Sequence, residues 1–465
     1  MSGSALMSLG TRAMFAASAG LQTTGHNIAN ANVAGYSRQT IQTQTSAGQF
    51  TGAGFFGKGA DVVGVVRAYD EQLTRQAANT LSQSTYDRTR FEQLRRLEEA
   101  FGLGERGIGN AATQMFNAMS DVASRPLDLP SRSVVLARAS EVTARFNSAA
   151  ASLGALQDGV TNDFRLQVAE ANQLASNIAS VNRQIAELKG LDQPPNDLLD
   201  QRDQLVNRLS SLIQVTTVPA DDGTLSVFIA GGQRLVLGDD AATLSMMSDA
   251  ANPALAALGI VSGGVLRTIP DDAIGGGSLS GLLRFQNDDL QAGLTMLDEL
   301  ARSLVETVNA QQVLGFDMNG NPGQPLFTPL DPAAPAAFSM RVALADPRGL
   351  AAASADADNG NALAMTALRD ERFVNSPSFP NTTFAEAYAQ LIGEIGVRVQ
   401  GALAASDISA AVATSAESAR ASKSAVNLDE EAAMLIQYQQ AYQAAAKVLQ
   451  IAQSVFQELL DTAGR

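Results

Sequence analysis

Apolar residues recur every seven positions at both ends of the chain. Near the start, one row of the repeat is bulky and consists of Met7, Met14, Leu21 and Ile28. The interleaved row consists of the smaller residues Gly10, Ala17 and Thr24. A repeat of 3.5 residues is typical of coiled-coil helices. It predicts a helix over residues 4–32 that is marginal on its own, because each glycine in it costs about 1 kcal/mol relative to alanine.

The last helix carries the same repeat from residue 427 to 462. One row of its heptad positions contains Leu428, Leu435, Tyr442, Leu449 and Phe456. The other row contains Tyr438, Ala445, Ala452 and Leu459, with Glu431 as an exception near the start. Asn427 suits the N-cap position, and Glu430 completes a capping-box pattern. At 1.5 Å per residue this helix is about 50 Å long, and we expect it to pair with the N-terminal helix.

Between the two ends, helical patterns alternate with segments of a different kind. Helices are predicted over residues 69–101, then after the glycine-rich break at 102–109 up to residue 129, and over 131–189, 196–213, from 278 onwards and over 383–422. A short strand is predicted over residues 61–67. Residues 224–237 predict a β-hairpin that turns at Gly231-Gly232. Residues 316–380 are rich in Pro, Ala, Asn and Asp and predict loops with short strands.

These elements predict a fold of the α+β class that is mainly α. We expect four parts, of which two are discontinuous in sequence. They are a terminal coiled-coil layer of residues 1–38 with 427–465, a mainly helical core domain of residues 39–214 with 278–315 and 381–426, an inserted β-rich domain of residues 215–277, and a loop-rich segment of residues 316–380.

Charged residues are nearly missing from both ends. They make up 17% of the 465 residues, yet residues 1–37 contain only Arg12 and residues 432–457 contain only Lys447. Helices without a charged face need neighbours on several sides, so the two ends predict assembly. We expect their apolar rows to become buried within and between subunits. The expected self-assembly residues are Met7, Met14, Leu21, Ile28, Leu428, Leu435, Tyr438, Tyr442, Leu449, Phe456 and Leu459.

The remaining composition argues against several classes of function. A net charge of −15 opposes binding to nucleic acid and to anionic membranes, and no stretch approaches the roughly 18–20 apolar residues of a membrane span. The chain contains no cysteine, which excludes disulfides, thiolate catalysis and cysteine-ligated metals. Its one histidine, His26, has no acidic or nucleophilic neighbour in the sequence. We therefore expect no catalytic residue, no metal and no cofactor.

Two loops resemble ligand-binding motifs. Residues 52–58 match the spacing G-x-x-x-x-G-K of a phosphate loop, which requires Ser or Thr next and a helix after it. Here Gly59 and a β-like pattern follow, so a glycine-rich hairpin is favoured. Residues 317–321 resemble the start of an EF-hand loop, but Pro322 and Thr328 stand where its glycine and glutamate belong. A tight Asn-Gly turn is favoured there.

Three carboxylates also share one face of a predicted helix. Asp197, Asp200 and Asp203 are three residues apart, with Arg202 and Arg208 nearby. Such a cluster could be a pair of catalytic acids, but it is more typical of a solvated surface. We therefore predict a solvated face here.

Several segments resemble the axial proteins of bacterial flagella. Residues 27–39, NIANANVAGYSRQ, are similar to the N-terminal signature of those proteins, and GYSRQ at 35–39 resembles the hook-associated protein 1 (FlgK) family. Residues 424–433 and 438–446 are similar to the C-terminal motifs of the same family. Two internal stretches agree: residues 200–205, and residues 317–323 followed by Leu326-Phe327. Val33-Ala34 departs from the Thr-Pro pair that is frequent in the family.

The resemblance implies a non-enzymatic subunit of the junction between the flagellar hook and filament. Roughly eleven copies would form a ring between the hook protein and the next hook-associated protein. Subunits of this family pass unfolded through the flagellar type III export channel to the cell exterior, with a chaperone on the C-terminal segment. Residues 13–20 are only weakly similar to a signal peptide, which agrees with secretion without a cleaved signal. The implied fold places the terminal helices innermost, a helical layer in the middle and the β-rich domain outside.

Two alternatives remain. A flagellin-like or other flagellar axial subunit would carry similar terminal helices. A nucleotide-binding enzyme that uses the Gly52–Lys58 loop would belong to a different class, while no residue constellation supports a hydrolase carried on the scaffold. We also expect residues 1–35 and 428–465 to be disordered in the free subunit and to order on assembly.

Overall fold

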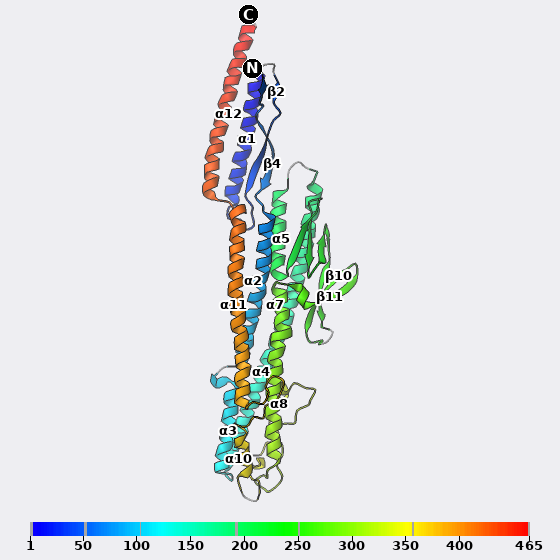
Figure 1. Ribbon diagram of the computed structural model, residues 1–465, viewed down its shortest axis with the longest axis vertical. Coiled ribbons are helices and arrows are strands. Elements are labelled where there is room, and N and C mark those ends of the chain that lie inside the picture. The colour runs from blue at the N-terminus through cyan, green and yellow to red at the C-terminus, as the bar shows by residue number, and fades with distance from the viewer. Residues whose placement is uncertain are drawn as a thin grey trace.

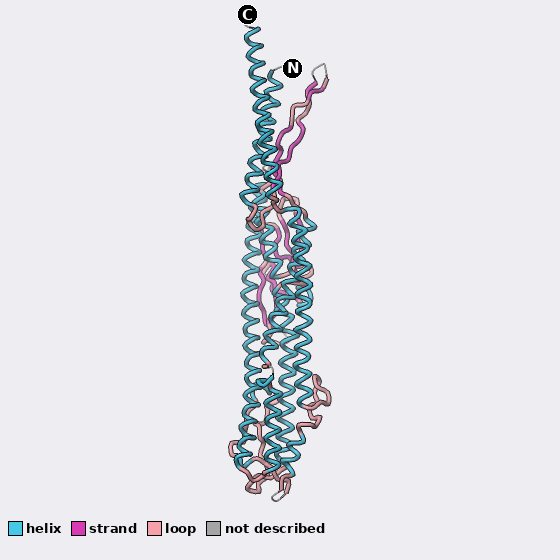
Figure 2. The backbone as a smooth tube through the Cα atoms, turned by 90° about the vertical axis from the view of Figure 1, so that its left-hand side faces the viewer, coloured by secondary structure: helices cyan, strands magenta, loops and turns pink. Residues whose placement is uncertain are grey.

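The computed structural model describes residues 3–50, 54–102, 104–190, 194–249, 252–355 and 358–463. The molecule is elongated: long helices form a rod, a β lobe lies along one side of the rod, and a pair of terminal helices extends beyond one end (Figures 1 and 2). Both ends of the chain lie at that same end. Within the described ranges, no helix is long and apolar enough to cross a membrane.

The two terminal helices lie side by side and run antiparallel. α1 spans Gly3–Asn30 and α12 spans Leu428–Ala463, so both predicted helices are confirmed. Asn427 caps α12, because its Oδ1 accepts a hydrogen bond of 3.0 Å from the backbone N–H of Asp429. Glu430, which the capping-box pattern assigned to this cap, accepts a hydrogen bond from Arg38.

The rod is built from long helices with recognisable start signals. They are α2 (Glu71–Ala100), α3 (Ile108–Ser124), α4 (Leu129–Leu188), α5 (Asn196–Leu212), α7 (Ser278–Arg284), α8 (Gln291–Val313) and α11 (Phe384–Ser424). Asp70 and Asp128 cap α2 and α4 with their carboxylates, and Thr383 and Glu386 form a capping box on α11. These helices agree with the predicted ranges, except that α3 ends at Ser124 instead of residue 129.

The helix predicted from residue 278 onwards is interrupted. Between α7 and α8, residues Phe285–Leu290 form a π-helical segment. Two buried polar side chains of this segment bond to different parts of the molecule. Gln286 reaches the β lobe, where it bonds the backbone of Ala256, while Asp289 accepts hydrogen bonds from Arg90 and Arg398 on two other helices. A wider π turn lets residues three positions apart point in more divergent directions than an α turn does.

The strands form a ribbon and a lobe. The ribbon pairs β1 (Gln39–Thr45) with β4 (Ala60–Arg67), and β2 (Gln49–Phe50) pairs with β3 (Phe55–Phe56) near its tip. The lobe contains a sheet of β5 (Val215–Pro219), β6 (Leu225–Ile229), β7 (Gln233–Leu237) and β8 (Asp240–Ala241), and a second sheet in which β10 (Ala256–Ser262) lies between β9 (Thr243–Ser248) and β11 (Val265–Ile269). All these pairs are antiparallel. The predicted hairpin is confirmed, and its turn residues Gly231 and Gly232 have φ of 70° and 116°, which favours glycine.

The remaining segments are short or irregular. The helices α6 (Asp271–Ile274), α9 (Ala336–Ser339) and α10 (Gly360–Ala367) accompany 3₁₀ turns at Gly104–Arg106 and Pro347–Gly349. Isolated β-bridges join Phe316 to Ala353 and Phe327 to Val342. Residues 316–380 are mostly loops, as predicted, but the described part of this segment contains the short helices α9 and α10 and isolated β-bridges in place of the predicted short strands.

Neutral amide side chains dock the extended segments onto the rod. Each bonds both the N–H and the C=O of one extended residue, as a neighbouring strand would. The pairs are Asn172 with Leu244, Asn182 with Leu225, Gln286 with Ala256, and Asn309 with Phe327. Asn182 and Gln286 are fully buried. These bonds satisfy backbone groups that would otherwise be buried without partners.

Candidate assembly interface

The terminal pair buries the small residues of its heptads. On α1 the buried positions are Gly10, Ala17, Gly20, Thr23, Thr24 and Asn27, and on α12 they are Glu431, Ala445 and Ala452. The helices approach so closely that a Cβ added at Gly20 would lie 2.6 Å from the ring of Tyr438, and one at Gly10 would lie 2.9 Å from Leu449. Small residues are therefore required on the inner face of α1.

The bulky row of α1 lies beside this seam. Met7, Met14 and Leu21 are half-buried, and Ile28 is 37% exposed. On α12, Leu435, Tyr438 and Leu449 are half-buried, whereas Leu428, Tyr442 and Phe456 are 50%, 39% and 45% exposed. Leu459 lies outside the residues whose side chains the structure describes.

Further apolar residues on the pair are exposed that the heptad rows did not include. They are Phe15, Ile436, Val448, Ile451, Val455 and Leu460. Because residues 1–37 and 432–457 each contain a single charged residue, apolar residues occur around most of the circumference of these helical segments, and the two heptad rows include only part of the exposed apolar surface. The lack of charge itself was the signal that pointed to them.

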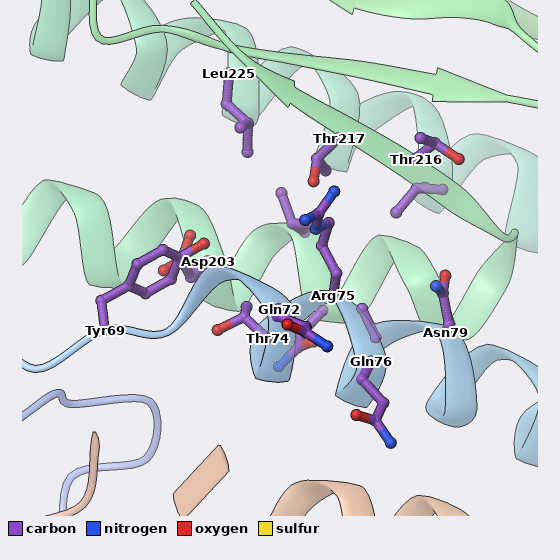
Figure 3. Close-up of a pocket in the computed structure, with 14 residues that line it drawn as sticks. Tyr69, Gln72, Thr74, Arg75, Gln76, Asn79, Asp203, Thr216, Thr217 and Leu225 are labelled. Atoms are coloured by element: carbon purple, nitrogen blue, oxygen red, sulfur yellow. The ribbon is translucent and has the colours of Figure 1, made fainter. Parts of the chain in front are cut away.

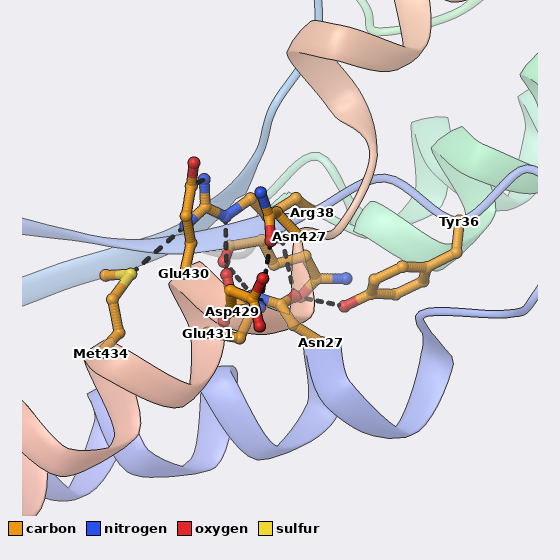
Figure 4. Close-up of polar contacts among 9 residues, drawn as sticks. Asn27, Tyr36, Arg38, Asn427, Asp429, Glu430, Glu431 and Met434 are labelled. Atoms are coloured by element: carbon orange, nitrogen blue, oxygen red, sulfur yellow. Dashed lines mark hydrogen bonds and ion pairs between the residues drawn. The ribbon is translucent and has the colours of Figure 1, made fainter.

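Asn27 is the centre of the joint between the terminal pair and the rod (Figure 4). Its amide nitrogen donates to the carbonyl of Gln39 at 2.8 Å and to Glu431 at 3.0 Å, and its Oδ1 accepts from the N–H of Gln39 at 2.9 Å and from the Tyr36 hydroxyl at 2.7 Å. These four bonds use two donors and two lone pairs, the full capacity of an amide side chain. Asn27 and Glu431 are each 1% exposed, so the joint is dry.

Arg38 joins the start of the ribbon to the start of α12 (Figure 4). Its Nε donates to Glu431 at 2.7 Å, its Nη1 to Glu430 at 2.9 Å and its Nη2 to the sulfur of Met434 at 3.3 Å. Its backbone N–H donates to Ser424 at the end of α11. The charge of buried Glu431 is thereby paired, which a buried carboxylate requires.

Tyr36 is held protonated at this joint. Burial raises its pKa, and the nearby carboxylates of Asp200, Asp197 and Glu431 raise it further. The hydroxyl therefore remains a donor to Asn27. The ring of His26 stacks edge-on against Tyr36 with centroids 5.5 Å apart, which gives the single histidine a packing role on an exposed face.

A buried ion-pair cluster fixes α5 to the ribbon, and it overturns one prediction. Asp200 is buried, and Arg67 donates to it at 2.7 Å while also pairing with Asp203 at 2.6 Å. Asp200 additionally accepts from the backbone N–H of Ser37 at 2.9 Å. The prediction of a solvated acidic face was wrong, since only Asp197 is exposed. The cation that neutralises the cluster comes from β4 and could not be inferred from helical spacing.

The charged groups of this cluster shift the pKa values of one another. Burial acts to lower the pKa of Arg67, but Asp203 and Asp200 outweigh it and raise that pKa. Burial raises the pKa of Asp203, which Arg67 partly offsets. The guanidinium also lies 4.4 Å above the ring of Tyr69, a cation–π geometry. Arg67 is therefore a fixed cation between strand β4 of the ribbon and helix α5.

Gly35 and the residues beside it meet α5. Gly35 has φ of 77°, and a Cβ there would lie 2.3 Å from Gln204, so both its conformation and its surroundings require glycine. Gln204 donates to the carbonyl of Ala34 at 2.9 Å. Residues 35–39, which resemble the motif of the FlgK family, thus connect the ribbon to α5 and to the terminal pair. Val33, which precedes this motif, is exposed.

The other candidate motifs are turns. Residues 52 and 53 lie outside the described residues, but strand β3 lies within the 52–58 segment and strand β4 follows it, so the segment does not precede a helix. Asp317 accepts hydrogen bonds from the backbone N–H groups of Asn319 and Asn321, and Gly320 has φ of 79°. The Asn-Gly turn is confirmed.

A groove of about 420 Å³ lies between α2, α5 and β5 (Figure 3). Arg75 and Asn79 point from α2 toward β5, and Asp203 and Tyr69 lie at one end. Asp203 is already paired with Arg67. The groove therefore presents mixed polar and apolar walls and an already neutralised carboxylate.

Comparisons with known proteins match this chain to flagellar proteins over most of its length. Residues 94–327 match the helical domain of flagellar hook-associated protein FlgK, and residues 418–462 match the C-terminal region of the flagellar basal body rod proteins FlgEFG. Flagellar hook-associated protein 1 of Salmonella typhimurium is 27% identical over 96% of this chain and 97% of its own length. Its counterpart in Bacillus subtilis is 27% identical over 97% of both chains.

A solved structure has the same fold. The flagellar hook junction protein FlgK from Burkholderia pseudomallei is 20% identical, with a TM-score of 0.68 over 74% of this chain and 99% of that one. The helical-domain match covers about half of the 465 residues, and it describes a structural flagellar protein, not an enzyme. The chain therefore belongs to the FlgK family of flagellar hook-associated proteins.

Proposed function

We propose that this protein is a structural subunit of the hook–filament junction and that it assembles through its terminal helices. The observation that carries the proposal is the exposed apolar surface of α1 and α12. Phe15 is 67% exposed, Ile451 is 54% exposed and Phe456 is 45% exposed, and they lie in segments 1–37 and 432–457, each of which contains a single charged residue. Such a surface on an extended helix pair is typical of a protein–protein interface.

The internal packing of the pair supports this function. The seam between α1 and α12 buries small residues of α1 against Tyr438 and Leu449, so the other bulky residues of the heptad rows remain at least partly exposed to neighbouring copies. The self-assembly residues, which we propose become buried within and between subunits, are Met7, Met14, Leu21, Ile28, Leu428, Leu435, Tyr438, Tyr442, Leu449, Phe456 and Leu459. Arg12, the one charge among the first 37 residues, pairs with Asp61 of the ribbon at 2.9 Å and so does not oppose burial of the helix.

In the proposed assembly the terminal pair forms the innermost layer, the rod the middle layer and the β lobe the outer surface. The corresponding parts are residues 1–38 with 427–465, residues 39–214 with 278–315 and 381–426, and residues 215–277, with residues 316–380 as a loop-rich segment of the rod. A ring of roughly eleven copies lies between the hook protein and the next hook-associated protein. The name of the relatives, hook-associated protein 1, supports this location.

Export completes the proposal. The chain leaves the cell unfolded through the flagellar export channel without a cleaved signal, and a chaperone covers its C-terminal segment. The lack of cysteine supports this route, because no disulfide can block an unfolded chain. The exposed apolar residues of α12 are the surface that a chaperone would have to shield before assembly.

Deleting the gene tests the junction role. Cells without it should keep their hooks, lose their filaments and release flagellin into the medium. Normal filaments would contradict the proposal, and loss of the hooks themselves would indicate a different axial subunit.

Complementation tests the role of the terminal pair. An Ile451→Asp, Phe456→Asp double variant should fail to restore filaments, because two charges would enter the subunit interface. Leu237→Asp, at a 45% exposed position of the β lobe, is the matched control and should restore them. Full restoration by the double variant would rule out this part of α12 as the interface.

A further inference from the structure

The turn at residues 317–321 contains an exposed Asn-Gly pair. It follows α8 at the end of the rod that is remote from the terminal pair (Figure 1). Asn319 and Gly320 are both exposed, and a Cβ added at Gly320 would meet no atom within 4 Å. Because glycine has no side chain and the surroundings are open, the backbone nitrogen of Gly320 is accessible to the side chain of Asn319. The assembly role proposed above does not use this pair.

An asparagine that precedes glycine can rearrange without an enzyme. The backbone nitrogen of Gly320 attacks the side-chain carbonyl carbon of Asn319, and a C–N bond forms between them. The bond from that carbon to the side-chain nitrogen breaks, and this nitrogen leaves as ammonia with the proton of the Gly320 N–H. Water from the solvent then opens the resulting succinimide ring at either carbonyl, which leaves aspartate or isoaspartate at position 319.

In the described part of the chain, the hydrogen bonds of this pair stay within the turn. The backbone N–H of Asn319 donates to the Asp317 carboxylate at 2.7 Å, and the side-chain amide of Asn319 bonds the same carboxylate. The N–H of Gly320 donates to the carbonyl of Asp317 at 3.1 Å. All three bonds end at one residue, so local opening of a single exposed turn releases both reacting groups together.

A second Asn-Gly pair is held by a different element. The side-chain nitrogen of Asn359 donates to the carbonyl of Ala123 in α3 at 2.6 Å. Asn359 is half-buried and is the N-cap residue of α10, and its own carbonyl accepts from the N–H of Leu363 at 3.0 Å. Ring closure at Asn359 must therefore break the contact with α3 and the start of α10.

Conversion at position 319 would oppose the turn in which it occurs. Burial acts to raise the pKa of Asp317, but hydrogen bonds from Asn321 and Asn319 outweigh it and lower that pKa, so Asp317 is ionised at neutral pH. Deamidation replaces the amide donor of Asn319 with a second carboxylate, and two neighbouring carboxylates repel each other. Isoaspartate also lengthens the backbone inside the turn, which the N–H of Asp317 closes on the carbonyl of Asn321 at 2.8 Å.

We propose that Asn319 is a site of spontaneous deamidation and that its conversion opens the 317–321 turn. Of the two Asn-Gly pairs, the pair at Asn319 converts while the pair at Asn359 persists. The modification marks the age of a folded subunit, because it accumulates with time and needs only water. It does not depend on the junction role, since neither a partner nor assembly takes part.

Peptide mapping by mass spectrometry tests the site. The purified full chain is incubated at mildly alkaline pH and sampled over several weeks. The peptide with Asn319 should acquire the mass change of NH₂ to OH, and separate into aspartate and isoaspartate forms, severalfold faster than the peptide with Asn359. In urea the two peptides should convert at similar rates, because only the fold distinguishes them. Equal rates in the folded chain, or no conversion at Asn319, would overturn the proposal.

Limited proteolysis tests the opening of the turn. Asn319→Asp fixes one of the two products in the chain, and proteinase K should cut it between residues 316 and 323 severalfold faster than it cuts the wild type, since opened surface turns are preferred sites of cleavage. Asn162→Asp, at an exposed position of α4, adds the same charge outside the turn and should be cut there at the wild-type rate. Equal cutting of the Asn319→Asp and wild-type chains would show that conversion leaves the turn closed.

Discussion

Single polar residues hold together elements that are far apart in sequence. Asn27 and Glu431 are 404 positions apart and bond directly, and Arg67 reaches Asp200 across 133 positions. Such residues have little freedom, because each buried polar group that loses its partner keeps its cost of desolvation. The 27–39 segment that resembles flagellar axial proteins is therefore constrained by packing of the joint.

Removing Asp200 should destabilise the subunit strongly. Asp200→Ala leaves the N–H of Ser37 without its acceptor and Arg67 with one carboxylate fewer, and breaking a buried ion pair costs about 3–5 kcal/mol. Urea unfolding followed by circular dichroism measures the loss in the free energy of unfolding. Asp197→Ala, one turn earlier and exposed, is the control and should cost less than about 1 kcal/mol. Equal losses would contradict the buried role of Asp200.

Tyr36 should make the joint sensitive to alkaline pH. The ordinary tyrosine pKa is 10.0, and burial with Asp200, Asp197 and Glu431 raises the pKa of Tyr36 in the folded state. Its contribution to stability is therefore complete below pH 10 and is lost as the pH rises from there through the folded-state pKa. Urea unfolding of assembled junctions, in which the terminal helices are ordered, at a series of alkaline pH values should show a shallower decline for Tyr36→Phe than for the wild type. Tyr442→Phe, at an exposed position, should decline as the wild type does.

At the scale of single residues, the sequence shows which side chains lie on one helix face. It does not show which residues from other elements contact them. The cluster of Asp197, Asp200 and Asp203 on one helix face was visible, but its burial was not. Helical periodicity describes the residues of one helix, whereas Arg67 approaches from a strand elsewhere in the chain. The prediction of a solvated face failed for that reason.

At the scale of elements, the terminal helices were predicted well and their facing sides were not. Period and capping residues identify α1 and α12 almost to the residue. Both heptad rows of α1 are uncharged, so charge cannot tell which row of that helix faces inward. Side-chain size decides it, because Gly10 and Gly20 allow Leu449 and Tyr438 to approach closely.

Gly20 should be essential for pairing of the terminal helices. Gly20→Val places a branched side chain where even a Cβ would lie 2.6 Å from the Tyr438 ring, so α1 and α12 must separate. Filament counts in a complemented deletion strain should fall sharply. Gly25→Ala is the matched control, because a Cβ there meets nothing within 4 Å; its counts should match the wild type. The same loss with both variants would show that the seam is not the cause.

The terminal helices should be unstable in the free subunit. They form a pair that lacks a third helix, and α12 packs chiefly on α1, so little apolar area holds them. Hydrogen exchange of the monomer should be fast over residues 1–35 and 428–465 and slow in the rod. In assembled junctions the same segments should become protected. Slow exchange in the monomer would contradict assembly-coupled ordering.

At the scale of the whole molecule, composition predicted a mainly helical protein with a β insertion, and the structure agrees. The sequence did not show how the β lobe is attached to the rod. Asn172 and Asn182 look like ordinary polar residues of a helix, yet they serve as strand partners for Leu244 and Leu225. Because amides do not titrate, we expect attachment of the β lobe to be insensitive to pH near neutrality.

Because the two terminal helices pair with each other, α1 can pair only after α12 has been synthesised. α1 is made first, but the helix it pairs with is the last 36-residue helix of the chain. A chain that is cut short, or that stalls before its end has been delivered, therefore has no partner for α1 and no Glu431 for Asn27. The terminal pair thus forms only in chains that contain both α1 and α12, and the topology itself acts as a check that both helices are present.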